Sequence, residues 1–253
     1  SGSGTMNAMV WNGVGWAAVT PAGLPSVVIN DSEASPFAVA YESQSGDAMV
    51  VFNNGTGGTT GISYAIWDGA GFSVSVVIDT PASGDVRHMK LAADPNSDRI
   101  VLVIANQGNR TQAFVGDGDA WDAGTIDWDG NGSVDYTDVN VVFEEQSGDA
   151  MVVYGGSSNA LRYQVWDGLA WSGGTVSAPG GADGPVRWTA IDADPTSDRI
   201  VVGAVTDERY TWLAVWDGDA WGSRQLAESD SAFSDRLNVA VAFETTTGEA
   251  LAA

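Results

Sequence analysis

The sequence has no cysteine, and its 253 residues include one histidine and one lysine. Disulfide bonds and thiolate metal sites are therefore excluded. A serine–histidine catalytic arrangement would depend on His88, which stands beside Met89 and Lys90. One histidine in this setting does not make a catalytic arrangement, so we expect His88 to be structural or exposed.

Positive charge is also scarce, with 10 Lys and Arg against 33 Asp and Glu and a formal net charge of −23. Such a surface repels phosphate backbones and anionic lipids, which argues against nucleic acid as a partner. No apolar run is long enough to span a bilayer, so direct membrane insertion is not expected. The acidity fits either an extracellular or cell-surface protein or an ordinary solubility charge.

Glycine and tryptophan are abundant, with 32 and 11 residues, and much of this content belongs to a repeated hexapeptide. The pattern Trp-Asp-Gly-x-x-Trp recurs at intervals of 49 to 56 residues. Its five copies are Trp11–Trp16, Trp67–Phe72, Gly116–Trp121, Trp166–Trp171 and Trp216–Trp221. Asp-Gly between apolar residues is typical of a tight hairpin turn, so each copy predicts one hairpin.

A second motif runs in phase with the first and alternates between two versions. The Glu version occupies 42–48, 144–150 and 244–250, and the Asp-Pro version occupies 94–100 and 194–200. Four strand-like runs fall in each repeat, and in the fourth they are 188–193, 200–205, 210–216 and a shorter run from Trp221. Four antiparallel strands in about 50 residues make one propeller blade, which predicts an all-β, five-bladed β-propeller.

The phase of the repeats assigns residue ranges to the blades. The segment Asn7–Trp11 matches a third strand, and the segment ending near Ala253 matches a second strand. We therefore expect these two segments to pair within one blade, because pairing removes exposed strand edges. An open array is the alternative. The expected blades are 24–76, 77–125, 126–175, 176–225, and 226–253 completed by 1–23.

An Asp-rich segment between the second and third repeats predicts a calcium loop. Oxygen-bearing residues recur at alternate positions, with a glycine at loop position 6 for a sharp turn, and this spacing suits a hard cation. The expected ligands are Asp127, Asp129, Asn131, Ser133 (through its carbonyl), Asp135 and Asp138. The loop resembles those of dockerin modules and of FG-GAP propeller blades, and the latter likewise lead into a strand. An Asp-rich turn without an ion is the alternative.

The Trp-Asp-Gly turn resembles the Asp-box of sialidase-like propellers and the Trp-rich blades of propeller lectins. This identifies the chain as similar to a bacterial or archaeal Trp-Asp-Gly repeat propeller, and the Asp-box implies fold and not activity. The segments before the first strands carry acidic and basic residues that would form a polar ligand site or pair with one another. These residues are Asp85, Arg87, Asp183, Arg187, Asp235 and Arg236.

Three functions remain open from the sequence. The first is a non-catalytic adhesion or binding module for a glycan or protein ligand, and the second is a structural subunit that contacts neighbouring subunits in a surface assembly. The third is a glycoside hydrolase, which needs two carboxylates in a central pocket. The innermost strands offer only Asp192 for that role. The absence of a second acid there favours a protein that is not an enzyme.

Overall fold

The computed structural model describes residues 2–4, 7–19, 27–29, 35–53, 61–73, 76–79, 86–106, 110–117, 120–121, 126–129, 136–231 and 236–253. Every regular element in these ranges is a β-strand. Across the same ranges there is no helix whose length and apolar character would let it cross a membrane.

Sixteen strands form four antiparallel sheets, each with its strands in sequence order, and we refer to these sheets as blades one to four. Blade one contains β5 (Phe37–Tyr41), β6 (Ala48–Asn53), β7 (Gly61–Trp67) and β8 (Val76–Asp79). Blade two contains β9 (Val86–Ala93), β10 (Ile100–Asn106), β11 (Arg110–Gly116) and β12 (Ile126–Asp129). Blade three contains β13 (Val139–Phe143), β14 (Ala150–Tyr154), β15 (Leu161–Trp166) and β16 (Trp171–Val176). Blade four contains β17 (Val186–Ala193), β18 (Ile200–Thr206), β19 (Thr211–Trp216) and β20 (Trp221–Glu228).

Six further strands form three two-stranded sheets. The hairpin of β2 (Ala8–Trp11) and β3 (Trp16–Val19) is one, and β21 (Val241–Phe243) with β22 (Ala250–Ala252) is another. The third pairs β1 (Gly2–Gly4) with β4 (Val27–Ile29), and the sequence patterns did not predict it.

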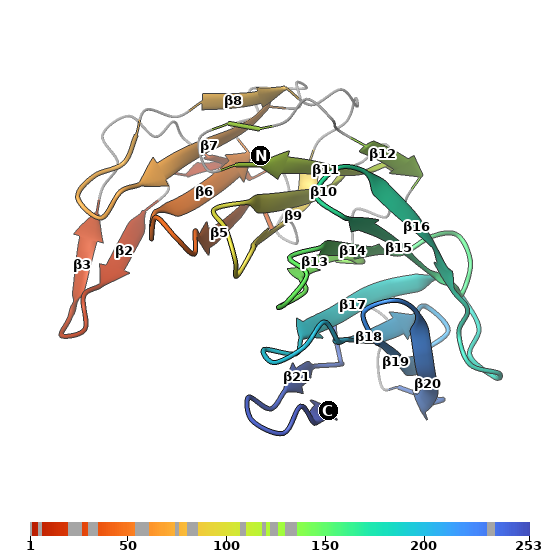
Figure 1. The fold of residues 1–253 in the computed structure, drawn as a ribbon. Coiled ribbons are helices and arrows are strands. Elements are labelled where there is room, and N and C mark those ends of the chain that lie inside the picture. The colour runs from red at the N-terminus through yellow and green to blue at the C-terminus, as the bar shows by residue number, and fades with distance from the viewer. Residues whose placement is uncertain are drawn as a thin grey trace.

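The four blades follow one another along an arc with β5, β9, β13 and β17 on its inner side (Figure 1). The hairpin β2–β3 lies at one end of the arc and β21–β22 at the other (Figure 1). Apolar side chains fill the spaces between neighbouring blades. Ile100 and Leu102 of β10 pack toward blade one, whereas Val101 and Val103 pack toward blade three. This alternation follows from the two-residue period of a strand, which gives each blade two apolar faces.

The Trp-Asp-Gly motif forms the hairpin between third and fourth strands, as predicted. In blade four the Asp217 carboxylate accepts hydrogen bonds from the amides of Asp219 and Ala220, and Gly218 adopts a positive φ of 105°. The rings of Trp216 and Trp221 then meet at 5.6 Å across the hairpin. The hairpin β2–β3 has the same construction, with Trp11 and Trp16 5.8 Å apart. It therefore has the structure of a third and fourth strand.

The second motif forms the turn between first and second strands, also as predicted. Its first residue donates its amide to a carbonyl five residues later in both versions, as in Glu144 to Asp149 and Asp194 to Arg199. Turns of neighbouring blades also contact each other. The Asp198 carboxylate of blade four accepts hydrogen bonds from the amides of Gln146 (2.7 Å) and Ser147 (3.0 Å) of blade three. The Asp98 carboxylate makes the equivalent bonds to blade one.

Two expectations about the limits of the blades differ from the structure. β12 pairs with β11, so blade two continues to Asp129, beyond the expected limit at residue 125. β8 and β20 likewise continue beyond residues 76 and 225, because the outer strands are longer than their weak apolar patterns suggested. The expected pairing of 7–11 with the segment near Ala253 is not formed between the described strands, because β2–β3 and β21–β22 are separate two-stranded sheets.

Candidate binding site

An arginine lies at a bulge near the start of the first strand in blades two and four. In blade four Val186 pairs with Thr206 and Trp188 pairs with Val205, which leaves Arg187 outside the ladder. Arg87 is skipped in the same way between Val86 and His88. A β-bulge redirects a side chain that would otherwise follow the strand alternation. The local irregularity of β17 therefore determines where Arg187 points.

Arg187 joins side chains from two blades. Its guanidinium carbon lies 4.7 Å from the ring centroid of Tyr136, which precedes β13, and its Nη2 lies 2.8 Å from Oδ2 of Asp207. The Tyr136 ring meets Trp188 edge-on at 5.7 Å. A guanidinium over an aromatic face is an attractive cation–π arrangement. Arg187, Asp207, Tyr136 and Trp188 form a polar and aromatic cluster, which we call the Arg187 cluster.

The Arg187 cluster has unused hydrogen-bonding capacity. Within the described part of the chain, the buried atoms Nε of Arg187 and Oδ1 of Asp207 have no hydrogen-bond partner. Buried polar atoms are normally paired, so a free donor and a free acceptor in one ion pair are typical of a site completed by a ligand or by water. Both side chains keep partial solvent exposure, at 18% and 29%. Gly184, with φ of 79°, allows the close approach of Asp207, because any Cβ there would collide with that carboxylate.

A second carboxylate lies near the cluster. Asp138 is buried, and burial raises its pKa to about 7, against the opposing influences of its own backbone amide and the positive charge of Arg187. The charge at the site therefore changes close to neutral pH.

Of the residues expected to form a polar site, only Arg187 belongs to this cluster. Asp183 is exposed and accepts a hydrogen bond from the amide of Gly184, so Arg187 pairs with Asp207 instead. Arg87 is buried in blade two, and Arg236 is exposed. Asp85 and Asp235 lie outside the described residues. Tyr136, Trp188 and Asp207 were not predicted as site residues from the sequence. The aromatic residue next to Arg187 was the one signal that could have indicated them.

The expected calcium loop is only partly described. Asp127 and Asp129 belong to β12, where they pair with Gln112 and Arg110. Asn131, Ser133 and Asp135 lie outside the described residues. Asp138 is described, and its carboxyl is buried near the guanidinium of Arg187. No group of three or more potential metal-binding side chains occurs in the described part of the chain.

The residues considered for catalysis have structural contacts. Asp192 accepts a hydrogen bond from the backbone amide of Phe243 at 2.8 Å, which links β17 to β21 of the next sheet. His88 is 1% exposed, and its Nδ1 lies 3.2 Å from the hydroxyl of Thr137, between blades two and three. His88 was expected to be structural or exposed, and the structure buries it at this contact. Asp192 connects two sheets, and this contact gives no support to a role in glycoside hydrolysis.

No protein-family model matches the sequence, and no curated protein matches it. Solved structures do match. The BP39L lectin from Burkholderia pseudomallei is 14% identical, with a TM-score of 0.60 over 96% of this chain and 71% of that one. A six-bladed β-propeller lectin with a fucose recognition mode, from Aleuria aurantia, is 16% identical, with a TM-score of 0.53 over 89% and 72% of the two chains. The NanB sialidase of Streptococcus pneumoniae is 10% identical, with a TM-score of 0.53 over 86% of this chain and 56% of its own length. This chain is therefore similar in fold to β-propellers of several functions.

Proposed function

We propose that the protein is a non-catalytic, carbohydrate-binding β-propeller module whose ligand site is the Arg187 cluster. The observation that carries the proposal is the Arg187–Asp207 ion pair, in which Arg187 Nε and Asp207 Oδ1 have no hydrogen-bond partner, next to two aromatic rings. Sugar hydroxyls both donate and accept hydrogen bonds, and the apolar face of a sugar ring packs on an aromatic side chain. Two of the similar structures are lectins, and the Aleuria aurantia lectin has also been solved with a fucose-containing disaccharide.

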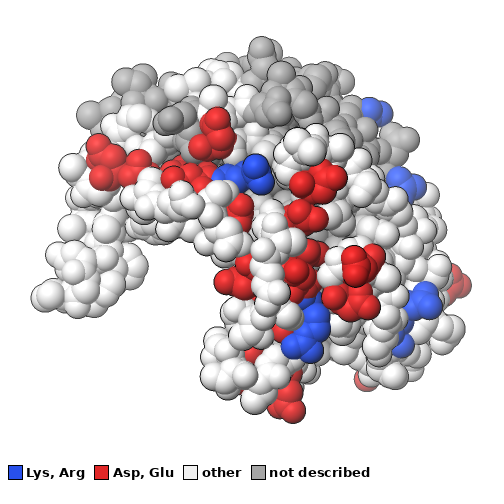
Figure 2. Space-filling model, in the orientation of Figure 1, with Lys and Arg blue, Asp and Glu red and all other residues white. Residues whose placement is uncertain are grey.

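The charge of the surface supports a neutral ligand. Asp and Glu side chains gather along the inner edge of the arc, with few Lys or Arg among them (Figure 2). With a net charge of −23, the protein repels anionic groups at long range. We therefore expect a neutral glycan to bind in preference to a sialylated or sulfated one.

Glycan binding can be tested by screening the protein on a glycan array and titrating the best neutral glycan by calorimetry. Arg187→Lys keeps the positive charge but loses the forked guanidinium, so affinity should fall at least about tenfold. Arg224→Lys is the matched control, because Arg224 on β20 is exposed and binds the carbonyl of Ser177. Failure to bind any glycan, or equal affinity of Arg187→Lys and wild type, would contradict the proposal.

A calcium ion bound by the loop around residues 127–135 is a further part of the proposal. Its support is the donor spacing in the sequence, with Asp127, Asp129, Asn131, Asp135 and Asp138 as side-chain ligands and Ser133 as a ligand through its carbonyl. Calcium should raise the melting temperature, and a chelator should reverse the rise, because an ion that binds only the folded state stabilises it. Asn131→Ala should abolish the rise. The acidic composition and this ion together favour an extracellular or cell-surface location.

We also propose five blades in all, with β21–β22 as the first and second strands of the fifth and β2–β3 as its third and fourth. The support is the hairpin structure of β2–β3, which matches that of the third and fourth strands elsewhere. A structural subunit of a surface assembly is a second candidate, favoured by the unpaired edges of β2 and β22. Filaments seen by electron microscopy would support that candidate.

A further inference from the structure

One face of blade one is exposed where the equivalent face of blade three is buried. Phe37, Val39 and Tyr41 of β5 are between 55% and 60% exposed. By alignment of the following turns, their equivalents in β13 are 139, 141 and 143, all at most 7% exposed. The β13 residues are covered by Val101 and Val103 of the preceding blade. The face of β5 is therefore built to receive a preceding blade.

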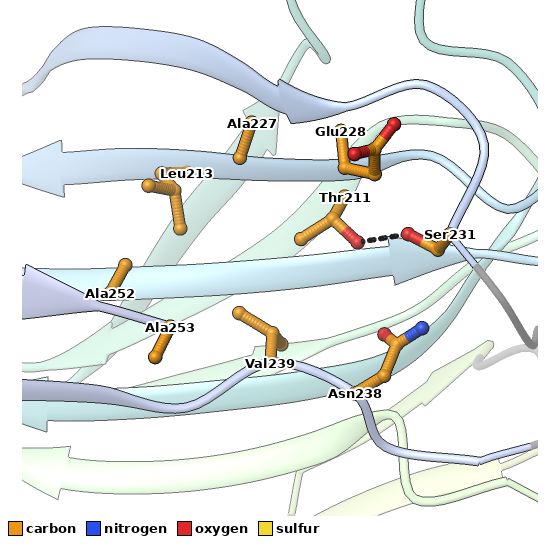
Figure 3. Close-up of a pocket in the computed structure, with 9 residues that line it drawn as sticks. All are labelled: Thr211, Leu213, Ala227, Glu228, Ser231, Asn238, Val239, Ala252 and Ala253. Carbon is orange, nitrogen blue, oxygen red and sulfur yellow. Dashed lines mark hydrogen bonds between the residues drawn. The ribbon is translucent and has the colours of Figure 1, made fainter.

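At the opposite end of the arc, blade four borders an apolar cavity that a following blade could fill. It has a volume of about 400 Å³ and lies between the β19–β20 face of blade four and the β21–β22 sheet (Figure 3). Apolar side chains make up much of its lining. Leu213 and Ala227 line it from blade four, Val239 from the segment before β21, and Ala252 from β22 (Figure 3). In the junction between blades three and four, the equivalent space is filled by the third and fourth strands of one blade packing on those of the next.

One face of the hairpin β2–β3 carries exposed apolar residues that could fill such a cavity. Met9 is 57% exposed, whereas three of its four equivalents, Ala65, Phe114 and Ala214, are at most 1% exposed, and the fourth, Gln164, is partly exposed. Trp11 is 52% exposed, whereas Trp216 is 6% exposed. Since side chains alternate along a strand, Ala8 and Val10 face the other way, toward a neighbour on the opposite side. One hairpin therefore has one apolar face for the cavity and a second face for blade one.

We infer that the hairpin β2–β3 of the same chain docks between blade four and blade one and pairs with β22. Met9 and Trp11 then enter the cavity, Val10 faces blade one, and Leu251 of β22, the equivalent of Val101, covers β5. The inference rests on the proposed composite fifth blade and adds its occupant, register and contacts. β3 ends at Val19 and β5 begins at Phe37, so 17 residues of the same chain connect the hairpin to blade one. Connection within one chain gives an effective concentration of about millimolar, well above that of a second molecule in dilute solution.

The four complete blades predict the register of the new pairing. In each blade the first residue of the second strand pairs with the first residue of the hexapeptide, as Ala48 does with Trp67 and Ile200 with Trp216. The same register holds in blades two and three. When the same register is applied to the fifth blade, β22 pairs with β2, and each residue of β22 has a defined partner. They are Ala250 with Trp11, Leu251 with Val10, and Ala252 with Met9.

Because the chain has no cysteine, engineered disulfides can test this register without background. We would make the double variants Val10→Cys with Leu251→Cys, and Met9→Cys with Ala252→Cys, since adjacent cross-strand pairs alternate in their spacing. The control is Val14→Cys with Leu251→Cys, because Val14 lies at the tip of the hairpin, three residues beyond the last expected pair. Each variant is oxidised at micromolar concentration and analysed by non-reducing electrophoresis and peptide mass mapping.

We expect an intramolecular disulfide in most molecules of at least one in-register variant, at a rate independent of protein concentration, and at least tenfold faster than in the control. Disulfide-linked dimers in the same register would overturn docking within one chain but leave the composite fifth blade standing. Cross-linking no faster than in the control would overturn both. Glycan binding is not measured in this experiment, so the fate of the carbohydrate proposal is decided separately.

Discussion

The turns of blade three and of the β21–β22 sheet share one motif but stabilise their amides differently. In blade three the amides of Gln146 and Ser147 donate to Asp198, a residue of the next blade. In the last sheet the amides of Thr246 and Thr247 donate to Glu244 of the same turn. The first turn therefore depends on a neighbouring blade, and the last is complete by itself.

The different hydrogen bonding of the two turns is explained by the blade that comes next after each turn in the propeller. Blades two and four place an aspartate, Asp98 or Asp198, beside the preceding turn. Blade one has Gly46 at the equivalent position, so it offers no carboxylate to a preceding turn. A turn followed by blade one must satisfy its own amides, as the turn at Glu244 does. The self-capped turn is consistent with a junction between the last sheet and blade one.

The largest effect is expected from placing a charge on the equivalent faces of β13 and β5. Val141→Asp buries an unpaired carboxylate between blades two and three and should lower the free energy of unfolding by about 3–5 kcal/mol. Val39→Asp should cost about 1–2 kcal/mol, because the docked hairpin can detach without unfolding the four blades. Urea denaturation followed by tryptophan fluorescence measures both. Val14→Asp, at the exposed hairpin tip, is the control, and a Val39→Asp variant as stable as this control would count against docking.

Removing the acceptors of the two turns should have a smaller effect. Asp198→Ala leaves two backbone amides of blade three without their acceptor and should cost about 1–3 kcal/mol. Glu244→Ala removes a local cap from a solvent-exposed turn, so its cost should be smaller than that of Asp198→Ala. Thermal unfolding of both variants gives the comparison. A larger loss for Glu244→Ala would show that the last turn depends on more than its own cap.

The smallest effect is a pH dependence of opposite sign in the two turns. Burial raises the pKa of Glu144 from 4.5 to about 7, although bonds from Ser147 and Trp216 oppose the rise. The folded state then binds this proton more tightly, so stability falls as pH rises from about 4.5 to about 7. Hydrogen bonds from Thr246 and Thr247 lower the pKa of Glu244 to about 2, so its contribution is present above pH 4.5 and is lost as pH falls toward 2.

Melting temperatures measured from pH 3 to pH 8 should therefore separate two glutamine variants. Glu144→Gln should be relatively more stable than wild type at pH 8 than at pH 5. Glu244→Gln should be relatively less stable at pH 6 than at pH 3. If the melting temperatures of wild type and Glu144→Gln change with pH in the same way, the Glu144 carboxyl is not the cause of the loss of stability between about pH 4.5 and about pH 7.

Local features of the fold could be predicted from the sequence, whereas the contacts of the candidate site could not. The Asp217 turn depends on an aspartate followed directly by a glycine, so its geometry is local. Arg187, by contrast, pairs with Asp207 across a strand pair and not with Asp183 in its own segment. A bulge in β17 decides this choice, and the sequence pattern did not reveal the bulge.

The sequence by itself determined the strands, both kinds of turn and the two apolar faces of each blade, because these depend on residue alternation and on short-range hydrogen bonds. Only the tertiary structure decided which faces are covered. Val39 and Val141 are the same residue type at equivalent positions, yet one is 60% exposed and the other 7%. Burial is a property of what lies opposite a side chain, and that neighbour can come from a distant part of the chain.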